Sequence, residues 1–302
     1  MNTILFHLAG GDAFFSGFTA VAFGALIMAM SRGKQHRIGS AAILLGWILV
    51  VASATAFSIS YYVVLGITSL LSMTARPRRN STSGDKSQNE VGTETESQSL
   101  GLRSCSFLCL MTLGAIVFEF VVYHPSSVQI SSQRPIIVIG DSLSAGINDG
   151  VDIPWPEHLD AMTSQNVSNN AVAGATSRTA LKQLTGLPKQ CVVLVEIGGN
   201  DLLSGRSSSE FRADLDELLT ALQTPERNVV IFELPLPPLF NGYGYAQREL
   251  AAKYGVTLIP RRLLASVLFS QNATLDSIHL SNDGHRQLAE RVAEFLSLDD
   301  QE

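Results

Sequence analysis

The segment Cys191–Ile197 constrains the fold of this 302-residue chain more than any other. Six of its seven residues are apolar, and Glu196 is the exception. A short, continuous apolar run is typical of a strand that is buried on both faces of a parallel sheet. Because consecutive parallel strands need crossover connections, the segment predicts an α/β domain with helices on both sides of the sheet.

The rest of the C-terminal half continues this alternation of short apolar runs and amphipathic stretches. Runs that predict strands lie at 135–140, 167–172, 191–197, 228–234 and 256–260. Stretches that predict helices lie at 155–162, 177–187, 210–222, 246–254 and 282–296. Five strands interleaved with helices predict a three-layer α/β/α domain with a five-stranded parallel sheet over residues 135–298.

The N-terminal half predicts transmembrane helices. Residues 13–30 are uncharged and, at about 1.5 Å per residue, long enough to cross a hydrocarbon core about 30 Å thick. Residues 41–73 are apolar but too long for one crossing, so we expect a hairpin of two short helices at about 41–57 and 60–73. A re-entrant loop is the alternative. A last helix is expected at 105–124.

The cations of this half predict its orientation. Two clusters flank the apolar stretch 41–73: Arg32, Lys34 and Arg37 before it, and Arg76, Arg78 and Arg79 after it. Both clusters favour the cytoplasm, which requires an even number of crossings between them. The polar composition of 80–104 predicts a disordered linker, and 125–134 is expected to be a tether. The domain 135–298 is then expected on the extracytoplasmic side, as part of an integral membrane protein.

Short blocks that carry chemistry follow the predicted strands. Ser142 follows the first strand, Gly174 the second and Asn200 the third, whereas Asp276 and His279 lie in the last loop. Since the carboxyl ends of parallel strands meet at one edge of a sheet, these blocks are expected to converge. A serine nucleophile, a histidine base, an aspartate that orients it, and glycine and asparagine donors for an oxyanion are the parts of an acyl-transfer site.

Charge and cysteine content exclude two other kinds of site. Residues 135–302 carry 12 Lys/Arg and 21 Asp/Glu, a net charge of −9, which argues against nucleic-acid binding. Cys105, Cys109 and Cys191 do not cluster with histidines at metal-ligand spacing, so we expect no metal site. His285 competes with His279 as the base but falls within the closing helix, where packing is the expected role.

The blocks resemble the SGNH (GDSL) hydrolase family, whose name lists the residue types of Ser142, Gly174, Asn200 and His279. The resemblance implies a flavodoxin-like fold, a Ser–His–Asp mechanism with Asp276, and no cofactor. It also implies an oxyanion hole made by the backbone amides of Ser142 and Gly174 with the side chain of Asn200.

Further segments are similar to the bacterial thioesterase/lysophospholipase/arylesterase branch of that family: Trp155-Pro156, Pro235–Pro238 and Asp283–His285. Ala175 and Leu280 stand where many members have Asp and Pro. Neither is a catalytic position, so the departure concerns the shape of the substrate loops.

The expected function is therefore a membrane-anchored serine hydrolase of acyl esters, with a small-molecule, lipid or glycan ester as substrate. A short tether favours a lysophospholipid or another ester close to the membrane. Two alternatives stay open: an O-acetylesterase or O-acyltransferase acting on cell-surface glycans, and a domain that binds such an ester without catalysis.

Overall fold

The computed structural model describes residues 2–30, 34–74, 88–123, 134–147, 153–276 and 278–298. The chain forms two compact units. The sheet unit comprises Met1–Gly11 and Tyr123–Glu302, and the helical unit comprises Asp12–Val122.

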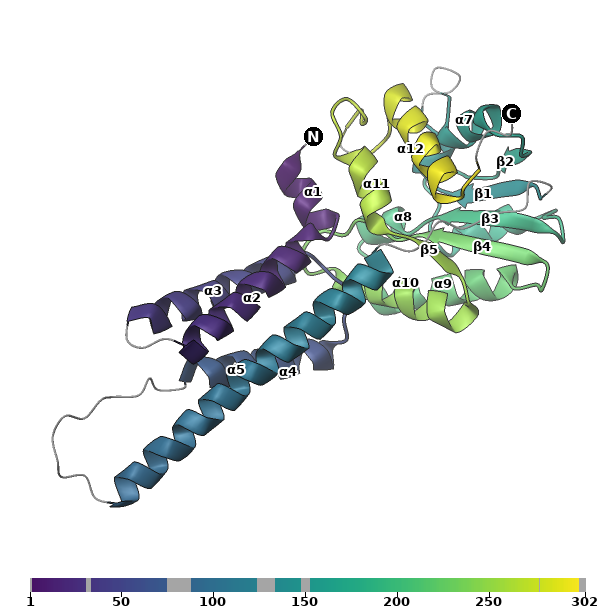
Figure 1. Cartoon of the computed structure of the whole chain (residues 1–302). Helices are drawn as coiled ribbons and strands as arrows, with labels where there is room; N and C mark the ends of the chain where they lie inside the picture. The colour runs from purple at the N-terminus through teal and green to yellow at the C-terminus, as the bar shows by residue number, and fades with distance from the viewer. Residues whose placement is uncertain are drawn as a thin grey trace. The chain divides into compact units, whose positions relative to one another are not determined.

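The sheet unit is built on five parallel strands in the order β2-β1-β3-β4-β5 (Figure 1). These are β1 (Ile136–Gly140), β2 (Val167–Asn169), β3 (Cys191–Glu196), β4 (Arg227–Phe232) and β5 (Thr257–Ile259). This order is that of the flavodoxin-like doubly wound fold, in which ligands bind at the carboxyl edge where β1 and β3 lead away in opposite directions. The predicted fold class is confirmed.

Helices cover both faces of the sheet (Figure 1). One face carries α7 (Trp155–Met162), α11 (Arg261–Leu268) and α12 (Asn282–Phe295), and the other carries α9 (Ser208–Leu222) and α10 (Asn241–Tyr254). Every residue of β1 and β3 is buried between these layers. Burial of each large aliphatic side chain contributes roughly 1.5–3 kcal/mol, so the two central strands are the stable platform on which the site stands.

Two segments of the sheet unit differ from the prediction. The second strand ends at Asn169, whose side chain accepts the N–H of Ala171 (3.1 Å) and donates to the carbonyl of Ser144 (2.8 Å). Beyond it, the N–H groups of Asn170 and Val172 still donate to the β1 carbonyls of Val138 (2.8 Å) and Gly140 (3.1 Å). The stretch 177–187 forms a 3-10 helix, η1 (Thr179–Leu184), in place of an α-helix.

An additional helix, α1 (Thr3–Ala9), belongs to the sheet unit although it lies at the opposite end of the chain. The N–H of Asn2 donates to the carbonyl of Phe269 (2.9 Å), just after α11. The guanidinium of Arg262 lies 5.1 Å from the centre of the Phe6 ring, a cation–π contact. The sequence predicted neither α1 nor α11.

The helical unit consists of α2 (Asp12–Met30), α3 (Lys34–Ala52), α4 (Ile59–Thr74) and α5 (Gln88–Tyr123). Among the described residues, three segments are long and apolar enough to cross a membrane: Asp12–Met30, Gln35–Ala52 and Leu102–Val121. The apolar part of α4, Ile59–Met73, is shorter.

Glycines let α2 and α3 pack closely. A Cβ on Gly17 would lie 2.6 Å from the carbonyl oxygen of Gly46, and one on Gly24 would lie 2.6 Å from that of Gly39. Small residues at such positions allow helix backbones to approach in a membrane. The pairing of 17 with 46 and of 24 with 39 makes the two helices antiparallel.

The second predicted helix, 41–57, instead occupies Lys34–Ala52, and the turn to α4 falls at 53–58. The apolar pattern hid the start of this helix, because its first turn carries Lys34 and Arg37.

The predicted disordered linker 80–104 is helical from Gln88 onward, as the first part of α5. Residues 88–104 contain no proline, the residue that most strongly ends a helix, so the helix of the apolar span extends back through them. Residues 75–87, with Arg76, Arg78 and Arg79, and all of the tether except Arg134 lie outside the described residues.

Candidate active site

Ser142 is the first residue of a short helix, α6 (Ser142–Ala145), which follows β1 directly. The carboxylate of Asp141 caps this helix by accepting the N–H of Leu143 at 3.0 Å. Gly140 is required here, because a Cβ would lie 2.7 Å from the hydroxyl oxygen of Ser144 and 2.9 Å from the carbonyl oxygen of Glu196. The sharp exit from β1 therefore presents Ser142 at the carboxyl edge of the sheet.

His279 and Asp276 form the predicted pair, with 2.7 Å between His279 Nδ1 and Asp276 Oδ2. The other oxygen of Asp276 accepts the backbone N–H groups of Ile278 (3.1 Å) and His279 (2.8 Å). These bonds, with the one to the imidazole, lower the pKa of Asp276 to about 2. An ionised Asp276 holds the proton of the imidazole on Nδ1 and leaves Nε2 as the basic nitrogen.

The loop that carries this pair is closed on itself. The N–H of Leu275 donates to the carbonyl of His279 at 2.8 Å, and Thr274 pairs with Leu280 in an antiparallel bridge. The side chain of Asp276 stays half exposed, with 53% of its surface accessible, so backbone bonds rather than burial hold it in place.

Asn200 ties the three remaining blocks together. It is the second residue of α8 (Gly199–Leu203), after β3. Its Nδ2 donates to Asp141 Oδ2 and to the carbonyl of Ala175, at 3.1 Å each. Because both amide protons are directed at acceptors, the amide has one fixed orientation beside Ser142 and Gly174.

Gly174 lies in a turn in which the N–H of Ala175 donates to the carbonyl of Val172. Its φ of +77° is a left-handed conformation that favours glycine, and a Cβ at this position would meet no atom within 4 Å. The N–H and hydroxyl of Ser177 both donate to the buried carboxylate of Asp201, which anchors the end of this loop to α8.

Chain neighbours of three of these blocks line one cavity of about 340 Å³. Its walls include Leu143, Gly199 and Ile278, the chain neighbours of Ser142, Asn200 and His279. The charge of His279 also acts on the pKa of Asp141, lowering it against the larger effect of burial, which raises it. Within the described residues, no hydrogen bond joins the Ser142 hydroxyl to His279.

Glu196 supports the site from inside the sheet. It is fully buried, and its Oε2 accepts the hydroxyl of Ser144 at 3.0 Å, which in turn accepts the indole N–H of Trp155 at 3.1 Å. Burial, with the nearby charge of Asp141, raises the pKa of Glu196 well above its usual range. The raised pKa favours the uncharged form of Glu196 beside Asp141, the residue that orients Asn200. The sequence analysis gave Glu196 no role. The feature that marks it is a single carboxyl group in an otherwise apolar strand.

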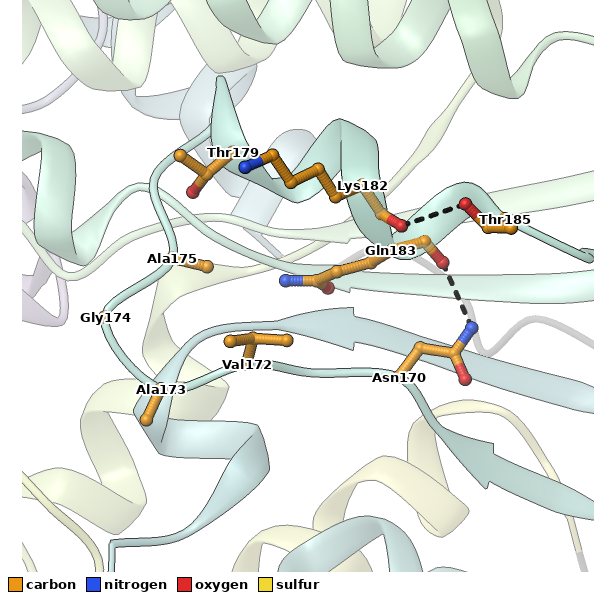
Figure 2. Close-up of a pocket in the computed structure, with 9 residues that line it drawn as sticks. All are labelled: Asn170, Val172, Ala173, Gly174, Ala175, Thr179, Lys182, Gln183 and Thr185. Atoms are coloured by element: carbon orange, nitrogen blue, oxygen red, sulfur yellow. Dashed lines mark hydrogen bonds between the residues drawn. The ribbon is translucent and has the colours of Figure 1, made fainter.

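A second cavity, of about 530 Å³, lies along the loop that carries Gly174 (Figure 2). It is bordered by the turn at Gly174 and by η1, and its lining includes the polar residues Asn170, Thr179, Lys182 and Gln183. His285 is buried, and its Nδ1 accepts the backbone N–H of Trp155 at 3.2 Å. No cluster of His, Cys, Asp and Glu in the described part of the chain is able to hold a metal ion.

Comparison with known proteins gives consistent matches in this half of the chain. The sequence profile of the GDSL-like Lipase/Acylhydrolase family matches residues 138–287. The thioesterase 1/protease 1/lysophospholipase L1 of Escherichia coli strain K12 is 28% identical over 171 residues, which cover 53% of this chain and 82% of the relative. The arylesterase of Vibrio mimicus is 27% identical over 194 residues, 60% of this chain and 96% of the relative.

Among solved structures, that of TesA is 26% identical, with a TM-score of 0.48, and covers 54% of this chain and 98% of its own.

Proposed function

Because residues 138–287 belong to the GDSL-like lipase/acylhydrolase family, the chain is an ester-hydrolysing enzyme, and we propose that it works through an acyl-enzyme on Ser142. The hydroxyl of Ser142 attacks the ester carbonyl while Nε2 of His279 takes its proton. His279 then protonates the leaving alcohol or thiol. A water molecule, deprotonated by the same nitrogen, releases the acid and restores Ser142.

The oxyanion of each tetrahedral intermediate is proposed to accept hydrogen bonds from three donors: the backbone N–H groups of Ser142 and Gly174, and Nδ2 of Asn200. Asn200 reaches the oxyanion when its bond to the carbonyl of Ala175 is exchanged for one to the substrate. The remaining bond to Asp141 keeps the amide oriented during that exchange. One such donor typically contributes about 2.7–4 kcal/mol to transition-state stabilisation.

One observation carries this proposal: His279 and Asp276 are joined at 2.7 Å, and Ile278, which lies between them in the chain, borders the same cavity as Leu143 and Gly199. A surface Asp–His pair without a function would have no reason to lie on a loop that borders the same cavity as the helix that begins at Ser142.

We test it with the full chain in lipid nanodiscs, using p-nitrophenyl esters and a fluorophosphonate probe. The expected result is ester turnover with labelling of Ser142, both lost in Ser142→Ala and kept in Ser209→Ala, a change on the surface of α9. Turnover that persists in Ser142→Ala would refute the acyl-enzyme. Binding of an ester without turnover or labelling would support the non-catalytic alternative.

We further propose that the helical unit anchors the enzyme in a membrane. Its three long apolar segments support this, as does the glycine-mediated packing of α2 on α3. The cations before α3 and after α4 favour the same side, which needs an even number of crossings between them. We therefore infer that α4, with 16 residues and a length of about 24 Å, crosses as well as α3.

The cations near the ends of α2, α3 and α4 favour the cytoplasm, which puts the sheet unit on the extracytoplasmic side. Single cysteines at Ser83 and Ser126, in a chain lacking its native cysteines, test this. We expect a membrane-impermeant maleimide added outside the cell to label the second and spare the first. Labelling of both from one side would refute the topology.

Acyl transfer to a glycan hydroxyl is the second candidate, because the cavity beside Gly174 offers polar groups that suit an acceptor. Product analysis with a sugar acceptor present distinguishes the two reactions: free acid indicates hydrolysis, and an acylated sugar indicates transfer.

A further inference from the structure

The cavity of about 340 Å³ is lined in part by residues outside the family match, namely Leu5, Leu8 and Ala9 of α1. Leu264 and Leu268 of α11, which lie within the match, also border this cavity. Its lining residues are all Leu, Ile, Ala, Phe, Pro or Gly, so no charged or polar side chain borders it. A space with this lining suits a hydrocarbon chain and offers nothing to a sugar or a charged headgroup.

The helix α1 is held against the sheet unit by specific contacts rather than by chain connectivity alone. Asn2 bonds the backbone of Phe269, and Phe6 is buried under the guanidinium of Arg262. Leu5 and Leu8 consequently face the cavity from a fixed helix, and Leu5 stays 47% exposed at its rim.

The position of the cavity identifies which part of a substrate would enter it. Leu143 and Ile278 border it as chain neighbours of the nucleophile and the base, so the part of a substrate that would reach it is the one attached close to the reacting carbonyl. The cavity beside Gly174 is lined by Lys182 and several amides and hydroxyls, and suits the polar alcohol part of an ester.

We propose that α1 forms the wall of an acyl-chain pocket, so that Leu5 and Leu8 set the length of the acyl chain that the enzyme accepts. This inference rests on the proposed acyl-enzyme at Ser142. A volume of about 340 Å³ is at the lower end of ligand pockets and takes one chain, not two. Since a cavity of about 150 Å³ holds one benzene molecule, the pocket takes a chain on the order of ten carbons. The substrate class is thus an ester or thioester with one medium-length acyl chain.

The test compares two variants of Leu8 with a matched control on the same helix. Leu8→Trp fills the pocket, Leu8→Ala enlarges it, and Ile4→Trp alters a residue that is 74% exposed and does not border it. The full chain in nanodiscs is assayed on p-nitrophenyl esters from acetyl to palmitoyl. Burial of each methylene favours binding about fourfold.

For Leu8→Trp, we expect kcat/KM to fall about fourfold for each methylene that no longer fits, while the acetyl ester keeps its rate. For Leu8→Ala, we expect the optimum to move to longer chains, and for Ile4→Trp the wild-type profile. The inference is overturned if the two Leu8 variants keep the wild-type profile or change all esters equally. Fluorophosphonate labelling of Ser142 is measured in parallel: an unshifted profile with labelling refutes only the pocket, whereas loss of labelling in the wild-type chain refutes the acyl-enzyme.

Discussion

Replacing Glu196 with glutamine is expected to remove a pH dependence from the stability of the sheet unit. Glu196 is buried, and its pKa in the folded chain is raised well above its usual range. An acid with a raised pKa stabilises the fold most below its unfolded pKa, near 4.3, and that contribution is lost as the pH rises toward the folded pKa. Each pH unit in between lowers the free energy of unfolding by about 1.4 kcal/mol.

For a domain of this size, 1 kcal/mol corresponds to about 2–4 °C in Tm, so the wild-type chain is expected to lose about 3–6 °C for each pH unit between the unfolded and the folded pKa. Glu196→Gln keeps an oxygen for the Ser144 hydroxyl, but it has no proton to lose. Its Tm is therefore expected to stay nearly level over the same range.

Trp155 reports this transition, because its indole N–H donates to Ser144 within the network. The chain has two tryptophans, and Trp47→Phe leaves Trp155 as the reporter. Glu196→Ala serves as the control: Ser144 loses its acceptor, and stability falls by about 1–3 kcal/mol at every pH. Parallel pH dependence in the wild-type chain and in Glu196→Gln would refute a protonated Glu196.

Three further predictions concern the reacting groups. Asp276→Asn is expected to lower kcat by a factor on the order of 10⁴ by favouring the wrong imidazole tautomer. In the wild-type chain, the pKa of Asp276 at about 2 predicts a slope of one in the acid limb of a plot of log kcat/KM against pH, and a slope of two would contradict it. Gly174→Ala is expected to lower kcat strongly but to lower the free energy of unfolding by only about 1–2 kcal/mol, because the new Cβ meets open space and only the left-handed φ is strained. An unchanged kcat would exclude the amide of residue 174 from the oxyanion hole. Asn200→Ala is expected to lower kcat roughly 10²–10³-fold. The control Asn228→Ala changes an exposed residue at the far end of β4 and is expected to leave kcat unchanged. Equal effects of the two substitutions would contradict the role of Asn200 as an oxyanion donor.

The sheet and the order of the blocks were predictable because both follow from local patterns. A continuous apolar run such as Cys191–Ile197 has few alternatives to a buried strand, and parallel strands bring their carboxyl ends to one edge. The Asp276–His279 pair was predictable because two residues three positions apart in one loop need no contact from elsewhere in the chain to meet.

The segments that escaped prediction are those whose environment comes from elsewhere in the chain. Seven residues form α1, which depends on contacts with Arg262 and Phe269 more than 250 residues away. The eight residues of α11 follow Pro260 immediately, so they read as the end of a strand segment. Glu196 had no partner within its own strand, because its acceptor role depends on Ser144 beyond β1.

The arrangement of these parts explains how a few hydrogen bonds suffice to align the site. Gly140 and Glu196 are partners in the register of β1 and β3, so the first and third blocks leave the sheet at the same level. A protonated Glu196 beneath them allows Asp141 to remain an acceptor for both Leu143 and Asn200 without a second buried charge. The orientation of the asparagine donor and that of the nucleophile's helix are thus set by one carboxylate. A change at Glu196 that leaves Ser142 and Asn200 intact is therefore expected to act on both through Asp141.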